Sequence, residues 1–203
     1  MKVQVLSKTD SEIQFQLSEV TPAFANALRR VMMNEVPVMA IEFVDFKKNG
    51  SVLPDELIAN RLGQIPLTFD QKVYNLPEEC KCEGKGCSRC QVELVLKKKG
   101  PNMVYSGDLK SKDKDVKPVF DKIPVVELFE GEEIQFETIA QLGKGKNHVK
   151  WQAAVVGYNY NNNNFTFKVE SVSGLAPEDI VTTAAEVLQQ KVELFEKEIK
   201  KLK

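Results

Sequence analysis

The C-terminal segment PEDIVTTAAEVLQQKVELFEKEIKKLK (residues 177–203) has the strongest periodicity in the chain. A proline followed by two acidic residues is typical of a helix start. A helix of about 25 residues would be nearly 40 Å long, at about 1.5 Å per residue. Its apolar stripe recurs at helical spacing and comprises Ile180, Ala184, Val187, Leu188, Val192, Phe195, Ile199 and Leu202.

This stripe is longer than a small sheet of two hairpins can cover. We therefore expect part of the stripe to contact another protein chain, through an interface that is larger and more apolar than a transient one. The alternative is that the helix packs entirely on its own sheet.

The N-terminal 40 residues predict a β-hairpin followed by a helix. Apolar residues alternate with period two at 3–5 and 13–17, on either side of a polar turn. Thr21-Pro22 is a capping residue followed by proline at the first helical position. Val36-Pro37 ends the helix, because the residue before a proline is pushed out of the α region. The apolar positions of this helix are Phe24, Ala27, Leu28 and Val31.

The middle of the chain predicts a mostly-β region with one short helix. The helix is expected from Pro54 to Gly63, with acidic residues in its first turn. Residues 97–122 hold eight lysines and few apolar residues, which indicates an exposed loop or hairpin. A polar turn is expected at 161–164. Strands are expected at 39–46, 92–96, 103–105, 124–129, 134–139 and 165–169, and a glycine-punctuated loop at 143–146 leads into residues 148–158.

All four cysteines of the chain lie within eleven residues, as Cys80, Cys82, Cys87 and Cys90. A C-x2-C pair on a tight turn lets both sulfur atoms reach one metal ion. Gly84 and Gly86 permit the positive φ values that a compact fold-back needs. Four thiolates favour a closed structural Zn²⁺ site. Disulfides and an iron–sulfur cluster are the alternatives, although the spacing differs from ferredoxin-type runs.

The composition excludes several classes of protein. With 203 residues, 42% apolar residues and a net charge of −1, the chain is expected to be globular rather than disordered. No apolar run is long enough to span a membrane and no signal peptide is evident, so a cytoplasmic location is expected. Recognised catalytic motifs are missing, and the single histidine, His148, has no evident catalytic partner. We therefore predict no catalytic residues in this chain.

Three further segments resemble the alpha-like subunits of RNA polymerase. The stretch NALRR (residues 26–30) is similar to the first helix of that family, and VLPDELIANRLGQIPL (52–67) to its second signature, with Asn60 where histidine is usual. The stretch GKNHVKW (145–151) resembles a third segment, with Val149 in place of alanine. The cysteine loop resembles that of the third-largest subunit of eukaryotic polymerase II. Length and the single cysteine cluster are most similar to the archaeal branch of this family, in a short form without the ferredoxin-like insertion.

The resemblance implies an α+β fold made of two domains. A discontinuous dimerisation domain, residues 1–40 and 155–203, would combine an antiparallel sheet with long helices. A mostly-β insert domain, residues 41–154, would carry the cysteine loop. The first and last helices would pair with subunit L, and Arg29 and Arg30 would lie toward a large subunit. The implied partner interface comprises Phe24, Ala27, Leu28, Arg29, Arg30, Val187, Leu188, Val192, Phe195 and Ile199.

The function that this resemblance implies is a non-catalytic scaffold for transcription. The heterodimer with subunit L would nucleate assembly of the large catalytic subunits and the small assembly subunits, and would meet DNA only through the complex. One alternative is a zinc-containing nucleic-acid-binding module that uses the lysine-rich residues 97–122. Another alternative is a redox carrier with an iron–sulfur centre.

Overall fold

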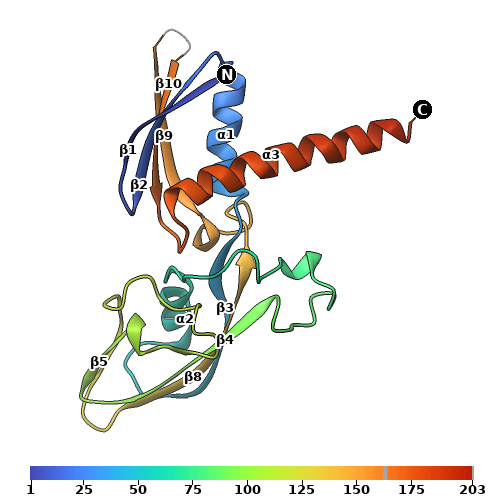
Figure 1. Ribbon diagram of the computed structural model, residues 1–203. Coiled ribbons are helices and arrows are strands. Elements are labelled where there is room, and N and C mark those ends of the chain that lie inside the picture. The colour runs from blue at the N-terminus through green and yellow to red at the C-terminus, as the bar shows by residue number, and fades with distance from the viewer. Residues whose placement is uncertain (162–163, 203) are drawn as a thin grey trace. The chain divides into compact units, whose positions relative to one another are not determined.

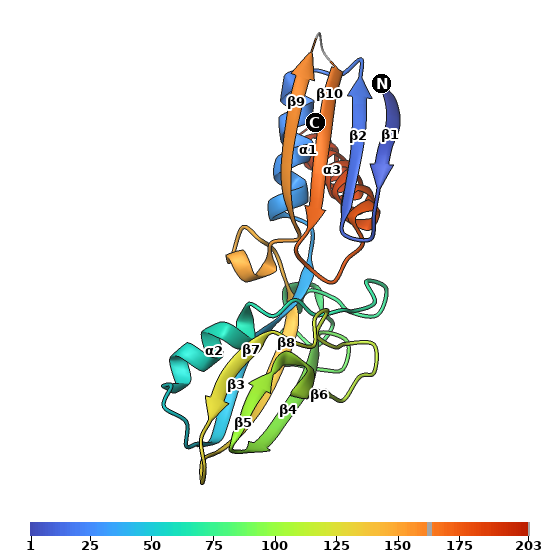
Figure 2. The same ribbon diagram turned by 90° about the vertical axis from the view of Figure 1, so that its left-hand side faces the viewer.

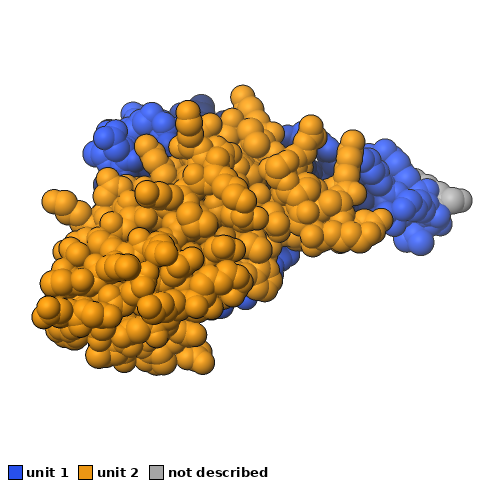
Figure 3. All heavy atoms as spheres, turned by 90° about the horizontal axis from the view of Figure 1, so that it is seen from below, with its two compact units in different colours: residues 1–36, 144–203 blue, residues 37–143 orange. Residues whose placement is uncertain are grey.

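The computed structural model describes residues 1–161 and 164–202 and confirms the α+β class. The chain forms two compact units (Figure 3). Residues 1–36 and 144–203 make the terminal unit, and residues 37–143 make the insert unit. The units divide after residues 36 and 143, whereas the insert domain was predicted to start at 41 and end at 154. The polar turn predicted at 161–164 has its two central residues outside the described range.

The terminal unit has an antiparallel four-stranded sheet in the order β1-β2-β10-β9 (Figure 2). Its strands are β1 (Lys2–Lys8), β2 (Glu12–Ser18), β9 (Ala154–Asn161) and β10 (Asn164–Ser171). The two ends of the chain meet where β2 pairs with β10. There Phe15 and Phe167 stack with their ring centroids 5.0 Å apart, which fixes the register of the two strands.

Two helices, α1 (Pro22–Asn34) and α3 (Pro177–Lys200), pack on the sheet of the terminal unit. The Thr21 hydroxyl accepts a hydrogen bond from the Phe24 N–H at 3.2 Å and caps α1, as predicted. Helix α3 buries three residues near its start, Pro177, Ile180 and Ala184. Its C-terminal half runs clear of the sheet and of α1 (Figure 1). No helix among the described residues is long and apolar enough to cross a membrane.

The insert unit is built on a sheet in the order β3-β8-β4-β6, with a second two-stranded sheet of β5 and β7. Helix α2 (Asp55–Gly63) buries Ile58 and Leu62 in a core that also includes Leu94, Leu128 and Phe136. The strands are β3 (Val38–Asn49), β4 (Gln91–Lys99), β5 (Asn102–Tyr105), β6 (Lys110–Ser111), β7 (Pro124–Leu128) and β8 (Glu133–Gly143). The described residues also form three short 3-10 helices. Two lie in the insert unit, η1 (Pro77–Glu79) and η2 (Ser106–Asp108), and η3 (Val149–Trp151) lies in the terminal unit.

The lysine-rich residues 97–122, predicted to be an exposed loop or hairpin, contain more regular structure than a loop. They include the end of β4, all of β5 and β6, and η2. Three isolated apolar residues, Val104, Leu109 and Val116, enter the core and hold the stretch in place. Because these residues are scattered rather than periodic, the sequence pattern does not reveal their burial.

Candidate functional site

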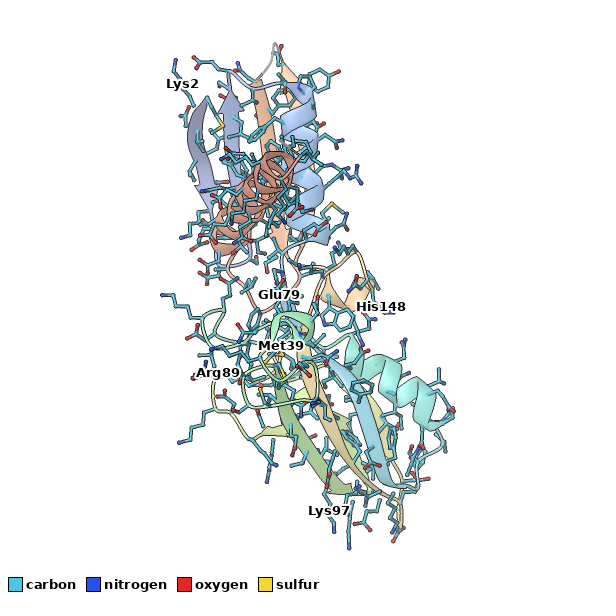
Figure 4. All side chains as sticks on the ribbon, turned by 90° about the vertical axis from the view of Figure 1, so that its right-hand side faces the viewer. Lys2, Met39, Glu79, Arg89, Lys97 and His148 are labelled. Atoms are coloured by element: carbon cyan, nitrogen blue, oxygen red, sulfur yellow. The ribbon has the colours of Figure 1, made fainter. Side chains whose placement is uncertain are left out.

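The four cysteines converge at one point of the insert unit. The loop folds back through positive φ angles at Glu83, Gly84 and Gly86. At the second pair, the Cys87 N–H donates to the Cys90 sulfur at 3.2 Å. All four Sγ atoms lie within 4.8 Å of one another. Glu79 and Arg89, on the same loop, are labelled in Figure 4.

The sulfur separations fit a single ion held by four thiolates. Sulfur atoms about 2.3 Å from a central ion, arranged as a tetrahedron, lie about 3.8 Å from one another. The observed distances are 3.6 Å for Cys80–Cys87, 3.5 Å for Cys82–Cys90 and 3.8 Å for Cys87–Cys90. A disulfide bond would bring two sulfur atoms to about 2.05 Å, and all four cysteines are free. The cluster can therefore hold a metal ion.

The thiols of Cys82 and Cys90 have different pKa values. Burial raises the pKa of the Cys90 thiol to about 12. Burial also opposes ionisation of Cys82, but hydrogen bonds from the Cys80 and Cys90 thiols outweigh it and lower the pKa of Cys82 to about 6. Cys80 and Cys90 are buried and Cys82 and Cys87 are half-buried, so a group of four thiolates here needs a cation to balance its charge.

A second candidate site is an apolar groove of about 370 Å³ in the terminal unit. Residues of β2, α1 and α3 line this groove, among them Phe15 and Leu17 of β2 and Leu28 of α1. Along α3, Val192 and Phe195 are each 67% exposed, and Ile199 is 42% exposed. The full lining is Met1, Val3, Phe15, Leu17, Phe24, Leu28, Val181, Ala185, Leu188, Gln189 and Val192.

Residues 41–160, more than half of the chain, match the family described as the RNA polymerase Rpb3/RpoA insert domain. The chain belongs to this family. Three relatives in the Rpb3/RpoA family are archaeal DNA-directed RNA polymerase subunits Rpo3. That of Methanothermobacter thermautotrophicus is 47% identical over 155 residues, covering 75% of this chain and 58% of the relative.

The other two relatives match at similar levels. The Archaeoglobus fulgidus protein is 43% identical over 155 residues, covering 76% of this chain and 59% of the relative. The Pyrococcus furiosus protein is 46% identical over 160 residues, with coverages of 79% and 59%. The chain thus spans about three fifths of the length of the curated relatives it matches. All three relatives thus share more than 40% identity with this chain over the aligned residues.

The predicted partner residues of this family member lie on two helices and differ in exposure. On α1, Leu28 is buried, Ala27 and Arg29 are half-buried, and Phe24 and Arg30 are exposed. On α3, Val187 and Leu188 are half-buried, and the stripe beyond them is exposed. Sequence reasoning missed the lining residues outside the predicted partner set, which are Met1, Val3, Phe15, Leu17, Val181, Ala185 and Gln189. The period-two alternation of Val3 with Val5 was the available signal.

The lysine-rich stretch does not support the nucleic-acid-binding alternative. Three of its lysines are in ion pairs: Lys98 with Asp108 at 2.6 Å, Lys97 with Glu133 at 3.8 Å, and Lys112 with Glu93. His148 caps the start of η3, where its Nδ1 accepts a hydrogen bond from the Lys150 N–H at 3.1 Å.

Proposed function

We propose that this chain is a non-catalytic assembly scaffold of DNA-dependent RNA polymerase. The observation that carries the proposal is the exposed apolar stripe of α3, which continues from an apolar groove in the same unit. In this proposal the stripe and groove pair with subunit L. The heterodimer then gathers the large catalytic and small assembly subunits, and contacts DNA only through the complex.

Hydrophobic burial supplies the free energy for this pairing. Apolar surface removed from water contributes about 25 cal/mol per Å². Fully burying a side chain such as Phe195 or Val192 therefore contributes about 1.5–3 kcal/mol. The proposed partner face comprises Phe24, Ala27, Leu28, Val187, Leu188, Val192, Phe195 and Ile199.

Arg29 and Arg30 are proposed to face a large catalytic subunit. The Arg30 side chain is exposed, and the Arg29 guanidinium lies 3.5 Å from the sulfur of Met33 on the same helix. Neither arginine has an ion-pair partner among the described residues, so both are available to a carboxylate of another chain.

We propose that the cysteine cluster holds one structural Zn²⁺ through Cys80, Cys82, Cys87 and Cys90. The tetrahedral sulfur separations support a single ion, and four sulfur ligands leave no open position for a substrate. The ion would balance the negative charge of the thiolates and hold the loop in its folded conformation. We also propose the short form of the subunit, since the four cysteines of the chain form a single cluster.

Native mass spectrometry with and without subunit L tests both proposals. We expect a one-to-one heterodimer, with one zinc per chain in a colourless preparation. Phe195→Glu should weaken the heterodimer by more than about 100-fold, because it places a charge in an apolar interface. Phe43→Glu is the matched control: Phe43 is 58% exposed on β3 of the insert unit, and its substitution should leave pairing intact.

Each proposal has its own contradicting outcome. Separate monomers at micromolar concentration, or equal effects of the two charge substitutions, would rule out the proposed interface. Iron in place of zinc, with a coloured preparation, would favour the redox alternative over a structural ion.

A further inference from the structure

Glu35 joins three elements of the terminal unit. One oxygen of its carboxylate accepts a hydrogen bond from Lys191 Nζ of α3 at 2.9 Å. The other oxygen lies 3.5 Å from Lys146 Nζ, on the loop that leads to η3. The Glu35 side chain is 17% exposed, whereas both lysines are about half exposed. The carboxylate is therefore the least exposed member of this ion-pair group.

The Glu35 carboxylate does not stabilise helix α1 itself. Glu35 is the C-terminal capping residue of α1, where its N–H donates to the Val31 carbonyl at 2.9 Å. The helix dipole disfavours negative charge at a helix C-terminus. Burial would raise the pKa of Glu35, but the hydrogen bonds and charges of Lys191 and Lys146 outweigh burial and lower this pKa. The favourable interactions of the carboxylate are therefore with α3 and the loop.

The loop around Lys146 is fixed firmly against the end of α1. The Lys146 N–H donates to the Asn34 carbonyl at 3.0 Å. A Cβ on Gly145 would lie 2.5 Å from the Met33 carbonyl oxygen, so this approach requires glycine. Glu35 thus lies beside a closely packed loop, and Lys191 is more exposed than Glu35.

The ion pair with Glu35 is the last polar tether of α3. Ala184 is the last buried residue of the helix, and residues 189–200 are all exposed. Within described residues 189–202, the polar contact that leaves the helix is Lys191–Glu35. The remaining polar side-chain contacts there are within the helix: Gln189–Glu193, Glu196–Lys200 and Glu198–Lys201.

We propose that Glu35 is a positioning residue that fixes the direction of the exposed half of α3. By holding Lys191, it presents the stripe of Val192, Phe195 and Ile199 in one orientation before a partner arrives. Holding a segment in its bound orientation reduces the conformational entropy that association must remove. The tether stands on the geometry alone, and its consequence for pairing rests on the proposed function.

The first test measures the direction of α3 in the full chain without a partner. The single tryptophan, Trp151, lies in the same unit and serves as an energy-transfer donor to a fluorophore attached at residue 202 through a genetically encoded azide. In Glu35→Gln we expect the donor–acceptor distance distribution to broaden about twofold, because the exposed half of the helix loses its tether. Lys191→Met breaks the same pair from the other side and should broaden the distribution equally.

Glu196→Gln is the matched control for this test. It removes an ion pair of 2.7 Å from the same helix, but that pair connects α3 only to itself. Its distance distribution should match that of the unsubstituted chain. An unchanged distribution in Glu35→Gln, or equal broadening in Glu196→Gln, would overturn the proposal.

The second test measures association with subunit L. Glu35→Gln should slow association about threefold to tenfold, as expected for the loss of a charge-assisted hydrogen bond that preorganises the helix. Glu196→Gln should change the rate less than about twofold. If the unsubstituted chain does not bind subunit L, the proposed function fails while the first test still decides the tether. If binding occurs and the two substitutions slow it equally, Glu35 has no positioning role.

Discussion

The helices of the two units use their apolar residues in opposite ways. Helix α2 has nine residues and fully buries Ile58 and Leu62 within the insert unit. Helix α3 has 24 residues, yet its buried residues are confined to its first two turns. Both sequences have apolar side chains at helical spacing, so periodicity alone does not distinguish a completed core from an open one. The size of the sheet that faces the helix makes the difference.

One chain thus combines a unit whose apolar core is closed with a unit whose apolar surface is left partly exposed. The insert unit encloses its apolar core between two sheets and α2. Its cysteine cluster lies in a loop outside this core. The terminal unit leaves part of its apolar surface unfilled. In the proposed scaffold, the insert unit keeps its shape in any assembly state, while the terminal unit is completed by its partner.

The prediction with the largest expected effect concerns the Zn²⁺ ion proposed for the cysteine loop of the insert unit. Removing the ion with a chelator, or substituting Cys90→Ser, should unfold the loop around residues 77–90. A structural zinc site contributes on the order of 10 kcal/mol to local folding. Hydrogen exchange followed by mass spectrometry should show lost protection in this loop and retained protection in β8 and the terminal unit.

Ser88→Ala is the control for the metal prediction. Ser88 is an exposed residue of the same loop and supplies no thiolate. Its substitution should leave exchange unchanged. If a chelator also leaves hydrogen exchange of the loop unchanged, the folded conformation of the loop does not depend on a metal ion.

A matched pair of phenylalanines tests the difference between the two cores. Phe136 of β8 is 0% exposed, whereas Phe195 of α3 is 67% exposed. Phe136→Ala should lower the free energy of unfolding of the isolated chain by about 3–5 kcal/mol, because it creates a cavity. Phe195→Ala should change it by less than about 0.5 kcal/mol. Urea unfolding of each variant measures both values, and equal costs would contradict an open terminal unit.

Local patterns predicted much of this fold, because hairpins, caps and helix stops depend on neighbouring residues. The hairpin of β1 and β2, the Thr21 cap and the extent of α2 follow from period-two alternation, side-chain capping and glycine at a helix end. On α1, however, the pattern missed the buried residues Ala25 and Met32. A helix covered on two sides buries more than one stripe, and local spacing does not show which sides are covered.

Long-range features of the candidate sites lay beyond the sequence pattern. Glu35 and Lys191 are 156 residues apart, and nothing local marks them as a pair. The cysteines were found because their four ligand atoms come from one short segment. The groove was found only in part, since its strand side depends on how β1 pairs with β2.

The smallest expected effect concerns an ion pair internal to the insert unit. The Asp108 carboxylate accepts hydrogen bonds from Lys98 Nζ at 2.6 Å and from the Tyr105 N–H at 2.8 Å. Burial opposes its charge, but these bonds outweigh burial and lower the pKa of Asp108 below its usual 3.8. Asp108→Asn should therefore cost about 1 kcal/mol of stability at neutral pH.

The pH dependence of that cost separates the ion pair from simple packing. Because the pKa of Asp108 is lower in the folded state, its contribution is fully present above the usual value of 3.8 and is lost as the pH falls through the folded value. The difference in urea midpoint between the unsubstituted chain and Asp108→Asn should be the same at pH 7 and pH 5, and should shrink below pH 4. Asp121→Asn, at an exposed position of the same unit, should show no such difference. A difference that persists unchanged into acid would mean that the Asp108 side chain stabilises the insert unit through packing and not through its charge.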